Sequence, residues 1–201
     1  MAAHYAYVYA WKFQSHSIQY VGPLDVWIPL EQLWGKKKFL FYYFSAGLGA
    51  AALQLFAYSV TFYPIMDTLT TAGFSSKDIL DSLAVGDMNL GWLEHVSRDA
   101  VQSLYNSYVV SMVGASGALY GILVAFAFLF PNVLLRIIFL PFLPIKAKYF
   151  VPILILGDLF FGFTSYSMGP VAHFAHVGGA ITGFVMMMYW KRNQFNQNRW
   201  N

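Results

Sequence analysis

The chain has 201 residues, of which 58% are hydrophobic and only 10% are charged, and its formal net charge is +3. So few charged side chains cannot cover a soluble protein of this length, which excludes a soluble globular domain and predicts a polytopic membrane protein. The lack of cysteine excludes disulfide bonds and cysteine-ligated metals. No nucleotide, metal or nucleic-acid motif is present, so we expect no cofactor and no nucleic-acid partner.

The N-terminal residues 1–28 contain no recognisable element. They are rich in tyrosine, histidine and tryptophan, they are too polar to cross a bilayer, and no helical or alternating period persists in them. Residues 29–38 then predict a loop that leads into a basic anchor at Lys36–Lys38. We therefore expect a membrane domain over residues 29–192, followed by a polar cytoplasmic tail at residues 193–201.

Four apolar segments are predicted to cross the membrane, since each approaches the roughly 20 residues that the hydrocarbon core requires. They cover residues 39–63, 108–130, 148–166 and 171–190. The first contains the small-residue stretch Gly47–Ala51, which is suited to close contact with another helix. Residues 133–144 are apolar but are interrupted by Arg136 and two prolines, which predicts an interfacial or bent segment.

The long polar stretch between the first two spans predicts two amphipathic surface helices rather than a binding site. The first begins at Ser75 or Ser76, runs through Ala84 and stops near Gly86. The second covers roughly residues 92–105.

The distribution of charge predicts the orientation in the membrane. The loop between the first two spans holds the acids Asp67, Asp78, Asp81, Asp87, Glu94 and Asp99 and the bases Lys77 and Arg98. The other side of the four spans holds Lys36, Lys37, Lys38, Arg136, Lys146, Lys148, Lys191, Arg192 and Arg199. Because loops rich in lysine and arginine stay cytoplasmic, we expect the acidic loop to face outward. The predicted location is a bacterial cell (inner) membrane, with the lipid bilayer as the surrounding partner.

Ser116 and His176 lie near the starts of the second and fourth spans. Both spans run from the outside inward in the predicted orientation. At 1.5 Å per residue, Ser116 lies about 12 Å and His176 about 8 Å below the start of its span. The two side chains are therefore expected to meet just below the outer surface, where water can reach them.

A meeting of these two helices requires their backbones to approach closely. Small residues recur at four-residue spacing in both, at Gly117 and Gly121 in one and at Ala175, Gly179 and Gly183 in the other. A serine hydroxyl is a poor nucleophile until a base removes its proton, and neutral imidazole is a common base. The pair therefore indicates nucleophilic catalysis, whereas each motif alone is also compatible with simple helix packing.

A Gly-x-Ser-Gly helix followed by an Ala-His-x-x-Gly helix resembles the rhomboid family of intramembrane serine proteases, and the resemblance extends over residues 29–192. It implies an all-α helical bundle with a six-helix core, of which about four transmembrane helices are present here. It also implies that Ser116 is the nucleophile and His176 the general base, and that transmembrane proteins are cleaved near the outer surface.

The resemblance also implies supporting roles for several neighbours. Tyr120, one turn below Ser116, matches a tyrosine that supports the histidine ring, and the Ser116 amide helps to hold the oxyanion. The supporting glycines are Gly114, Gly117 and Gly179. His173 is expected to be a wall residue, and Asp158 is expected to lie too deep to join the pair and to serve packing or a buried hydrogen bond.

One part of the family pattern is missing. The second core helix of the family carries a histidine and an asparagine, four residues apart, that line the oxyanion hole, and residues 1–28 contain no such pair. With suitable synonymous codons, a reading of this segment shifted by one nucleotide gives an apolar helix with that pair. We therefore interpret residues 1–28 as a frame-shifted remnant of a core helix and expect impaired activity from this chain.

Two other functions compete with proteolysis. A non-catalytic rhomboid-like protein would bind client transmembrane helices without an activated serine. A transporter is disfavoured, because Asp158 is the one acid within the four predicted spans and no lysine or arginine lies in their interiors to form a relay.

Overall fold

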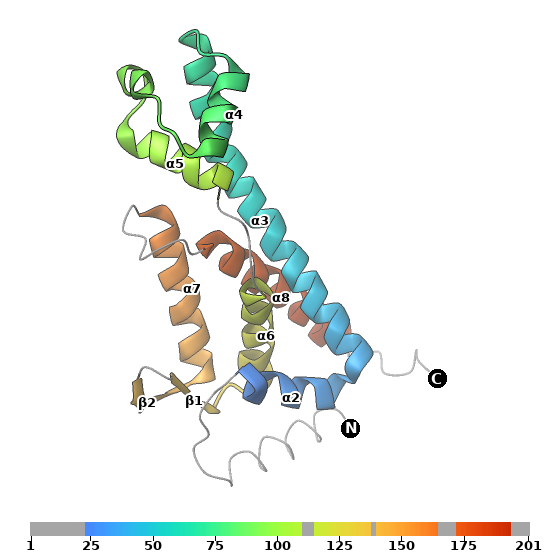
Figure 1. Cartoon of the computed structure of the whole chain (residues 1–201). Coiled ribbons are helices and arrows are strands. Elements are labelled where there is room, and N and C mark those ends of the chain that lie inside the picture. Colours follow the sequence, from blue (N-terminus) through green and yellow to red (C-terminus); the bar gives the residue numbers. More distant parts are fainter. Residues whose placement is uncertain (1–22, 110–114, 138–139, 165–171, 194–201) are drawn as a thin grey trace. The chain divides into compact units, whose positions relative to one another are not determined.

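The computed structural model describes residues 23–109, 115–137, 140–164 and 172–193, and Figure 1 shows their helices and strands. The chain divides into two compact units, the first made of residues 1–53 and 114–201 and the second of residues 54–113. Helix α3 (Lys36–Thr71) contributes its first half to one unit and its second half to the other.

The first unit is a helical bundle with one small hairpin. Besides the start of α3, it contains α2 (Pro23–Trp34), α6 (Ser116–Leu129), β1 (Leu134–Ile137), β2 (Leu140–Lys146), α7 (Ala147–Phe163) and α8 (His173–Asn193). Helices α6, α7 and α8 contact one another (Figure 1). The largest core cluster includes Leu30, Tyr42, Ile122, Phe126, Leu135 and Met187. The predicted helical fold is thus observed over most of the described chain.

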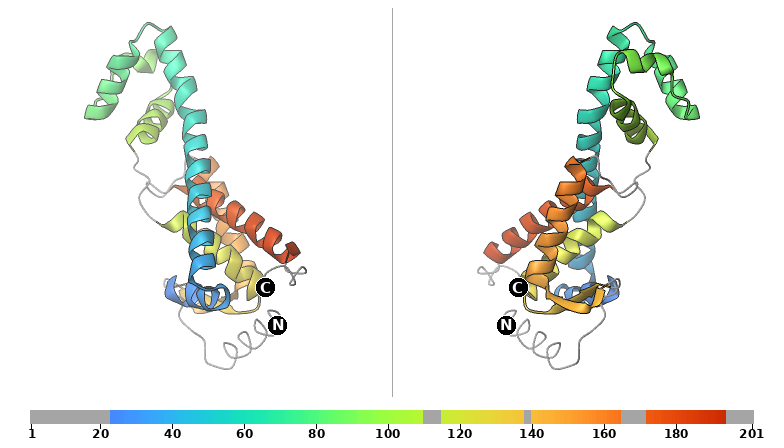
Figure 2. Two further views of the ribbon diagram at one scale, coloured as in Figure 1. Left: turned by 90° about the vertical axis from the view of Figure 1, so that its right-hand side faces the viewer. Right: turned by 90° about the vertical axis from the view of Figure 1, so that its left-hand side faces the viewer.

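The segment predicted as interfacial or bent, residues 133–144, forms an antiparallel hairpin instead. Its strands pair from Leu134 opposite Lys146 to Ile137 opposite Leu140. Figure 1 and the right-hand view of Figure 2 show the hairpin between α6 and α7. The two prolines in the second strand lack the amide hydrogen that a helix interior needs, so an extended conformation suits this sequence better than a helix.

The prediction of a loop over residues 29–38 is wrong, because α2 runs through Trp34 and α3 begins at Lys36. Only Gly35 separates the two helices, and its φ of 76° lies in the left-handed region that favours glycine. Helix α2 also begins within the segment expected to lack structure. The fully buried side chain of Leu30 explains this helix, since burial against the bundle supplies stability that sequence periodicity did not reveal.

Helix α3 is longer than the predicted first span, because it passes Pro64 and continues to Thr71. Among the described residues, α3 is the one helix long and apolar enough to cross a membrane by length and composition, and α6 is a shorter apolar helix. The predicted second span is not one continuous helix, since Tyr108 belongs to α5 while α6 begins at Ser116. The four-span topology therefore stays a prediction.

Large apolar side chains remain exposed along three helices of the bundle. They include Phe41, Phe44 and Leu48 on α3, Ile153, Leu156 and Phe160 on α7, and Phe184, Val185 and Met188 on α8. An apolar surface of this extent is typical of a protein that contacts lipid or other proteins. It suits the predicted membrane location.

The second unit packs short helices against the end of α3. It contains α4 (Ser76–Val85), the 3₁₀ helix η1 (Leu90–Glu94) and α5 (Arg98–Val109). The predicted first surface helix is confirmed, with Ser75 at its N-cap and Gly86 in the left-handed conformation at its C-cap. The predicted second helix is divided into η1 and α5. One buried apolar cluster joins these elements to α3. It consists of Met66, Leu69, Ile79, Leu83, Trp92, Val101 and Leu104.

Replacing Trp92 with alanine is expected to destabilise this second unit by about 3–5 kcal/mol, because its side chain is 1% exposed and truncation leaves a large cavity. Amide hydrogen exchange should then accelerate throughout α4 and α5. Leu90→Ala provides a matched control, since Leu90 lies in the same 3₁₀ helix and is 75% exposed. Unchanged protection in Trp92→Ala would show that this cluster does not hold the unit together.

Candidate active site

Small residues bring α6 and α8 into backbone contact. A Cβ atom placed on Gly117 would lie 3.1 Å from the carbonyl oxygen of Ala175, and one on Gly179 would collide with the carbonyl oxygen of Gly117. One turn further, a Cβ on Gly121 would lie 3.1 Å from the carbonyl oxygen of Gly179. The predicted close contact between these two helices is confirmed, and the order of the contacts shows that they run in the same direction.

The small-residue stretch of α3 packs against the same pair of helices. The Cβ of Ala50 would lie 2.5 Å from a Cβ on Gly117, and that of Ala46 would lie 2.5 Å from one on Gly121. The Tyr42 hydroxyl also donates a hydrogen bond to the carbonyl oxygen of Gly121, at 3.0 Å. The small face predicted for the first span is therefore a helix contact.

Ser116 is the first residue of α6, and Ala115 occupies the N-cap position. The first intrahelical amide bond runs from Leu119 to the Ala115 carbonyl oxygen at 2.9 Å. Amide groups in the first turn of a helix have no acceptor within the helix and carry partial positive charge. The Ser116 hydroxyl therefore lies beside amide groups that can stabilise a negative oxygen. Gly114, also predicted to support the site, lies outside the described residues.

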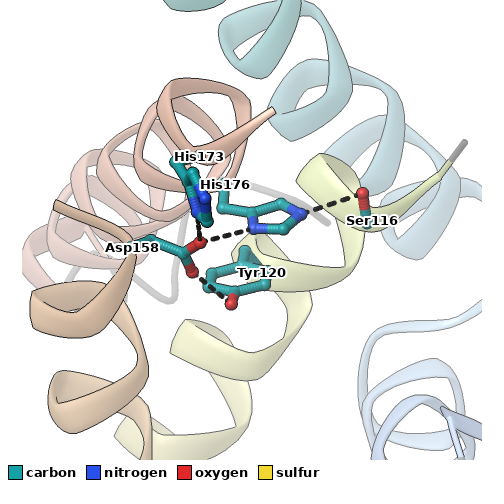
Figure 3. A network of polar contacts seen from close by, with 5 residues as sticks. All are labelled: Ser116, Tyr120, Asp158, His173 and His176. Atoms are coloured by element: carbon teal, nitrogen blue, oxygen red, sulfur yellow. Dashed lines mark hydrogen bonds and ion pairs between the residues drawn. The ribbon is translucent and has the colours of Figure 1, made fainter. Parts of the chain in front are cut away.

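Ser116 and His176 meet as the sequence suggested. The Nε2 atom of His176 lies 3.0 Å from the Oγ atom of Ser116 (Figure 3). Ser116 begins α6 and His176 lies in the first turn of α8, and the parallel packing of these helices places both side chains at the same end. Ser116 is exposed, so a reacting group can reach its hydroxyl.

Tyr120 lies one helical turn after Ser116 and supports the other side of the cluster. Its ring stacks on that of His176, with centroids 4.2 Å apart and planes inclined by 7°. Its hydroxyl donates a hydrogen bond to Oδ2 of Asp158. The tyrosine thus touches both the histidine ring and the carboxylate beside it (Figure 3).

The expectation that Asp158 lies too deep to reach the pair is wrong. Its Oδ1 atom lies 3.0 Å from Nδ1 of His176, and the residue is only 7% exposed. The predicted third span continued to Tyr166, whereas α7 ends at Phe163, five residues after Asp158. Asp158 therefore lies in the final turns of α7, where its carboxylate meets the two histidines of the first turn of α8.

His173, predicted to be a wall residue, belongs to the same cluster. Its Nδ1 atom lies 2.6 Å from Oδ1 of Asp158, so both histidines approach one carboxylate oxygen. The other ring nitrogen of His173 and the hydroxyl of Thr164 are buried without a hydrogen-bond partner among the described residues. The sequence signal for the contact was the three-residue spacing of His173 and His176, which places both on one helix face.

Asp158, His173 and His176 are also residue types that bind metal ions, and one potential ligand atom from each lies within 4.8 Å of the others. The direct nitrogen–oxygen distances of 2.6 and 3.0 Å are hydrogen-bond distances. A tetrahedral zinc ion with bonds of 2.0–2.2 Å would hold its ligands roughly 3.3–3.6 Å apart. The observed arrangement is therefore that of a hydrogen-bonded cluster.

Comparison with known proteins identifies one family. A family model described as Rhomboid domain matches residues 90–193, which is more than half of the chain and includes the whole cluster around Asp158. Residues 29–89, which the sequence resemblance also covered, lie outside this match. No curated protein and no solved structure matches the chain.

Proposed function

The chain belongs to the rhomboid family, and from this premise we propose that it is an intramembrane serine endopeptidase whose nucleophile is Ser116 and whose general base is His176. The family acts within membranes on transmembrane substrates. The observation that supports the proposal most directly is the 3.0 Å contact between Oγ of Ser116 and Nε2 of His176. Contacts of this length between a hydroxyl and an imidazole are the geometry of an activated nucleophile.

The proposed reaction proceeds through an acyl-enzyme. Oγ of Ser116 attacks the carbonyl carbon of the scissile peptide bond while its proton passes to Nε2 of His176. The Ser116 amide at the helix N-terminus donates to the resulting oxyanion. When the tetrahedral intermediate collapses, the peptide C–N bond breaks and His176 returns the proton to the leaving amine. Water, deprotonated by the same histidine, then hydrolyses the ester and restores the serine.

The proposed substrates are transmembrane helices cut near the outer membrane surface. A regular helix bonds its carbonyl groups internally, so a substrate must unwind locally before its peptide bond can reach Ser116. Substrates with glycine or proline near their outer ends should therefore react faster. We propose that the protein is a multi-pass protein of a bacterial inner membrane and that residues 29–192 form its membrane domain.

The proposed activity is reduced in this chain. Residues 1–28 lack the histidine–asparagine pair that lines the oxyanion hole in the family, in line with the proposed frame shift of that segment. Loss of one oxyanion donor lowers turnover by about 10²–10³-fold.

Cleavage of a single-pass substrate in proteoliposomes tests the function. We expect slow cleavage near the outer end of a glycine-containing substrate helix, and no cleavage by Ser116→Ala. Turnover typical of the family would contradict the expected impairment. Substrate that is cross-linked to the wild-type chain but never cut, even after long incubation, would instead indicate a protein that only binds client helices.

A further inference from the structure

The carboxylate of Asp158 joins three helices at the proposed active site. Ser116 and Tyr120 come from α6, Asp158 from α7, and His173 and His176 from α8 (Figure 3). One oxygen of Asp158 accepts from Tyr120, and the other lies within hydrogen-bond distance of both histidines. A carboxylate away from water is costly unless donors surround it, and these three groups supply them.

The contact with Asp158 fixes which nitrogen of His176 carries the proton. A carboxylate only accepts hydrogen bonds, so Nδ1 of His176, at 3.0 Å from Oδ1, must be the donor. A neutral imidazole has one protonated nitrogen, so Nε2 keeps its lone pair. That lone pair faces Oγ of Ser116 at 3.0 Å, which is the orientation a general base requires.

We infer that Asp158 is a positioning residue that completes a Ser116–His176–Asp158 triad by holding His176 in its base-competent tautomer and stabilising the imidazolium formed during attack. The inference rests on the proposed function and adds to it a residue outside the serine–histidine pair. Tyr120 and His173 hold the carboxylate in place, since each is hydrogen-bonded to it.

A purely structural role for Asp158 predicts different behaviour. If the carboxylate only braced the three helices, asparagine would serve nearly as well, because its amide oxygen still accepts from both histidines. An amide carries no charge, however, and cannot stabilise a developing imidazolium as a carboxylate does. In a serine protease triad, replacing the aspartate by asparagine lowers turnover by about 10⁴-fold without disturbing the geometry.

The test compares Asp158→Asn, Asp158→Ala and Gly157→Ala by thermal unfolding and by the rate at which a fluorophosphonate labels Ser116. We expect Asp158→Asn to unfold near the wild-type temperature but to react at least about 10-fold, and up to about 10⁴-fold, more slowly. Gly157→Ala is the matched control, since a Cβ there meets nothing within 4 Å, and it should react like the wild type. A stable Asp158→Asn variant labelled at the wild-type rate would overturn the inference.

A second readout does not depend on reactivity. Nitrogen-15 NMR of histidine-labelled protein should show the His176 proton on Nδ1 in the wild type and a shift toward Nε2 in Asp158→Ala, with His176→Phe identifying the signal. If the wild type is never labelled but carries this Nδ1 proton, the protease proposal fails while the positioning contact stands. A wild-type proton on Nε2 would overturn the contact whatever the reactivity.

Discussion

Replacing Ser116 with alanine is expected to remove all specific fluorophosphonate labelling from the folded chain. The reagent reacts with a serine only where a base takes up the hydroxyl proton. Among the described residues, His176 is the base within hydrogen-bond distance of the Ser116 hydroxyl. Ser59→Ala is the matched control, because the Ser59 hydroxyl donates a hydrogen bond to the carbonyl oxygen of Phe56 in its own helix, at 2.7 Å, and no described imidazole bonds to it. Labelling of Ser59→Ala should equal that of the wild type.

His176→Phe should lower labelling of the intact Ser116 by at least about 10³-fold, since loss of either member of a catalytic serine–histidine pair removes most of the rate enhancement. Phenylalanine keeps an aromatic ring that can stack on Tyr120, so the helix packing should persist. Thermal unfolding near the wild-type temperature would confirm that. Labelling of His176→Phe at the wild-type rate would mean that the serine is not activated by this histidine.

The second large effect is expected at Gly179, where alanine should destabilise the first unit by at least about 1–3 kcal/mol. A Cβ at this position collides with the backbone carbonyl of Gly117, so α6 and α8 must separate. Gly157→Ala again serves as the control, because its Cβ would enter open space and alanine favours a helix. The measurement is the midpoint of thermal unfolding in detergent for the two variants.

Separation of α6 from α8 should also affect the proposed chemistry. Gly179 lies one turn after His176 on α8, and the carbonyl it would displace belongs to the residue after Ser116. We expect labelling of Ser116 to fall in Gly179→Ala even below its unfolding temperature, because an ångström of displacement breaks the Ser116–His176 contact. Equal stability of the two glycine variants would contradict the packing account.

The features predicted correctly from sequence depend on local patterns. The glycines of α6 and α8 recur every four residues, so their shared face could be identified without the fold. The helix from Ser76 to Val85 was predicted because its N-cap serine and C-cap glycine have conformational preferences of their own. The same packing then explains why Ser116 and His176, sixty residues apart in sequence, come together.

The features missed depend on tertiary structure. Helix α2 forms where Leu30 is buried by distant residues, and the hairpin β1–β2 requires two segments to pair. Asp158 was expected to lie too deep, and its contact with His176 depends on how α7 packs against α8, which a linear sequence pattern does not show. The presence of a lone acid in a predicted membrane helix nevertheless indicated that Asp158 has polar partners, since an ionisable group within a membrane needs them.

The most direct test of the central proposal is to treat the wild-type chain in detergent with a fluorophosphonate and to locate the adduct by tandem mass spectrometry. We expect a slowly formed adduct on Ser116, which should be absent when the protein is unfolded before treatment. An adduct on another serine, or none on the folded chain after prolonged exposure, would contradict the assignment of Ser116 as an activated nucleophile.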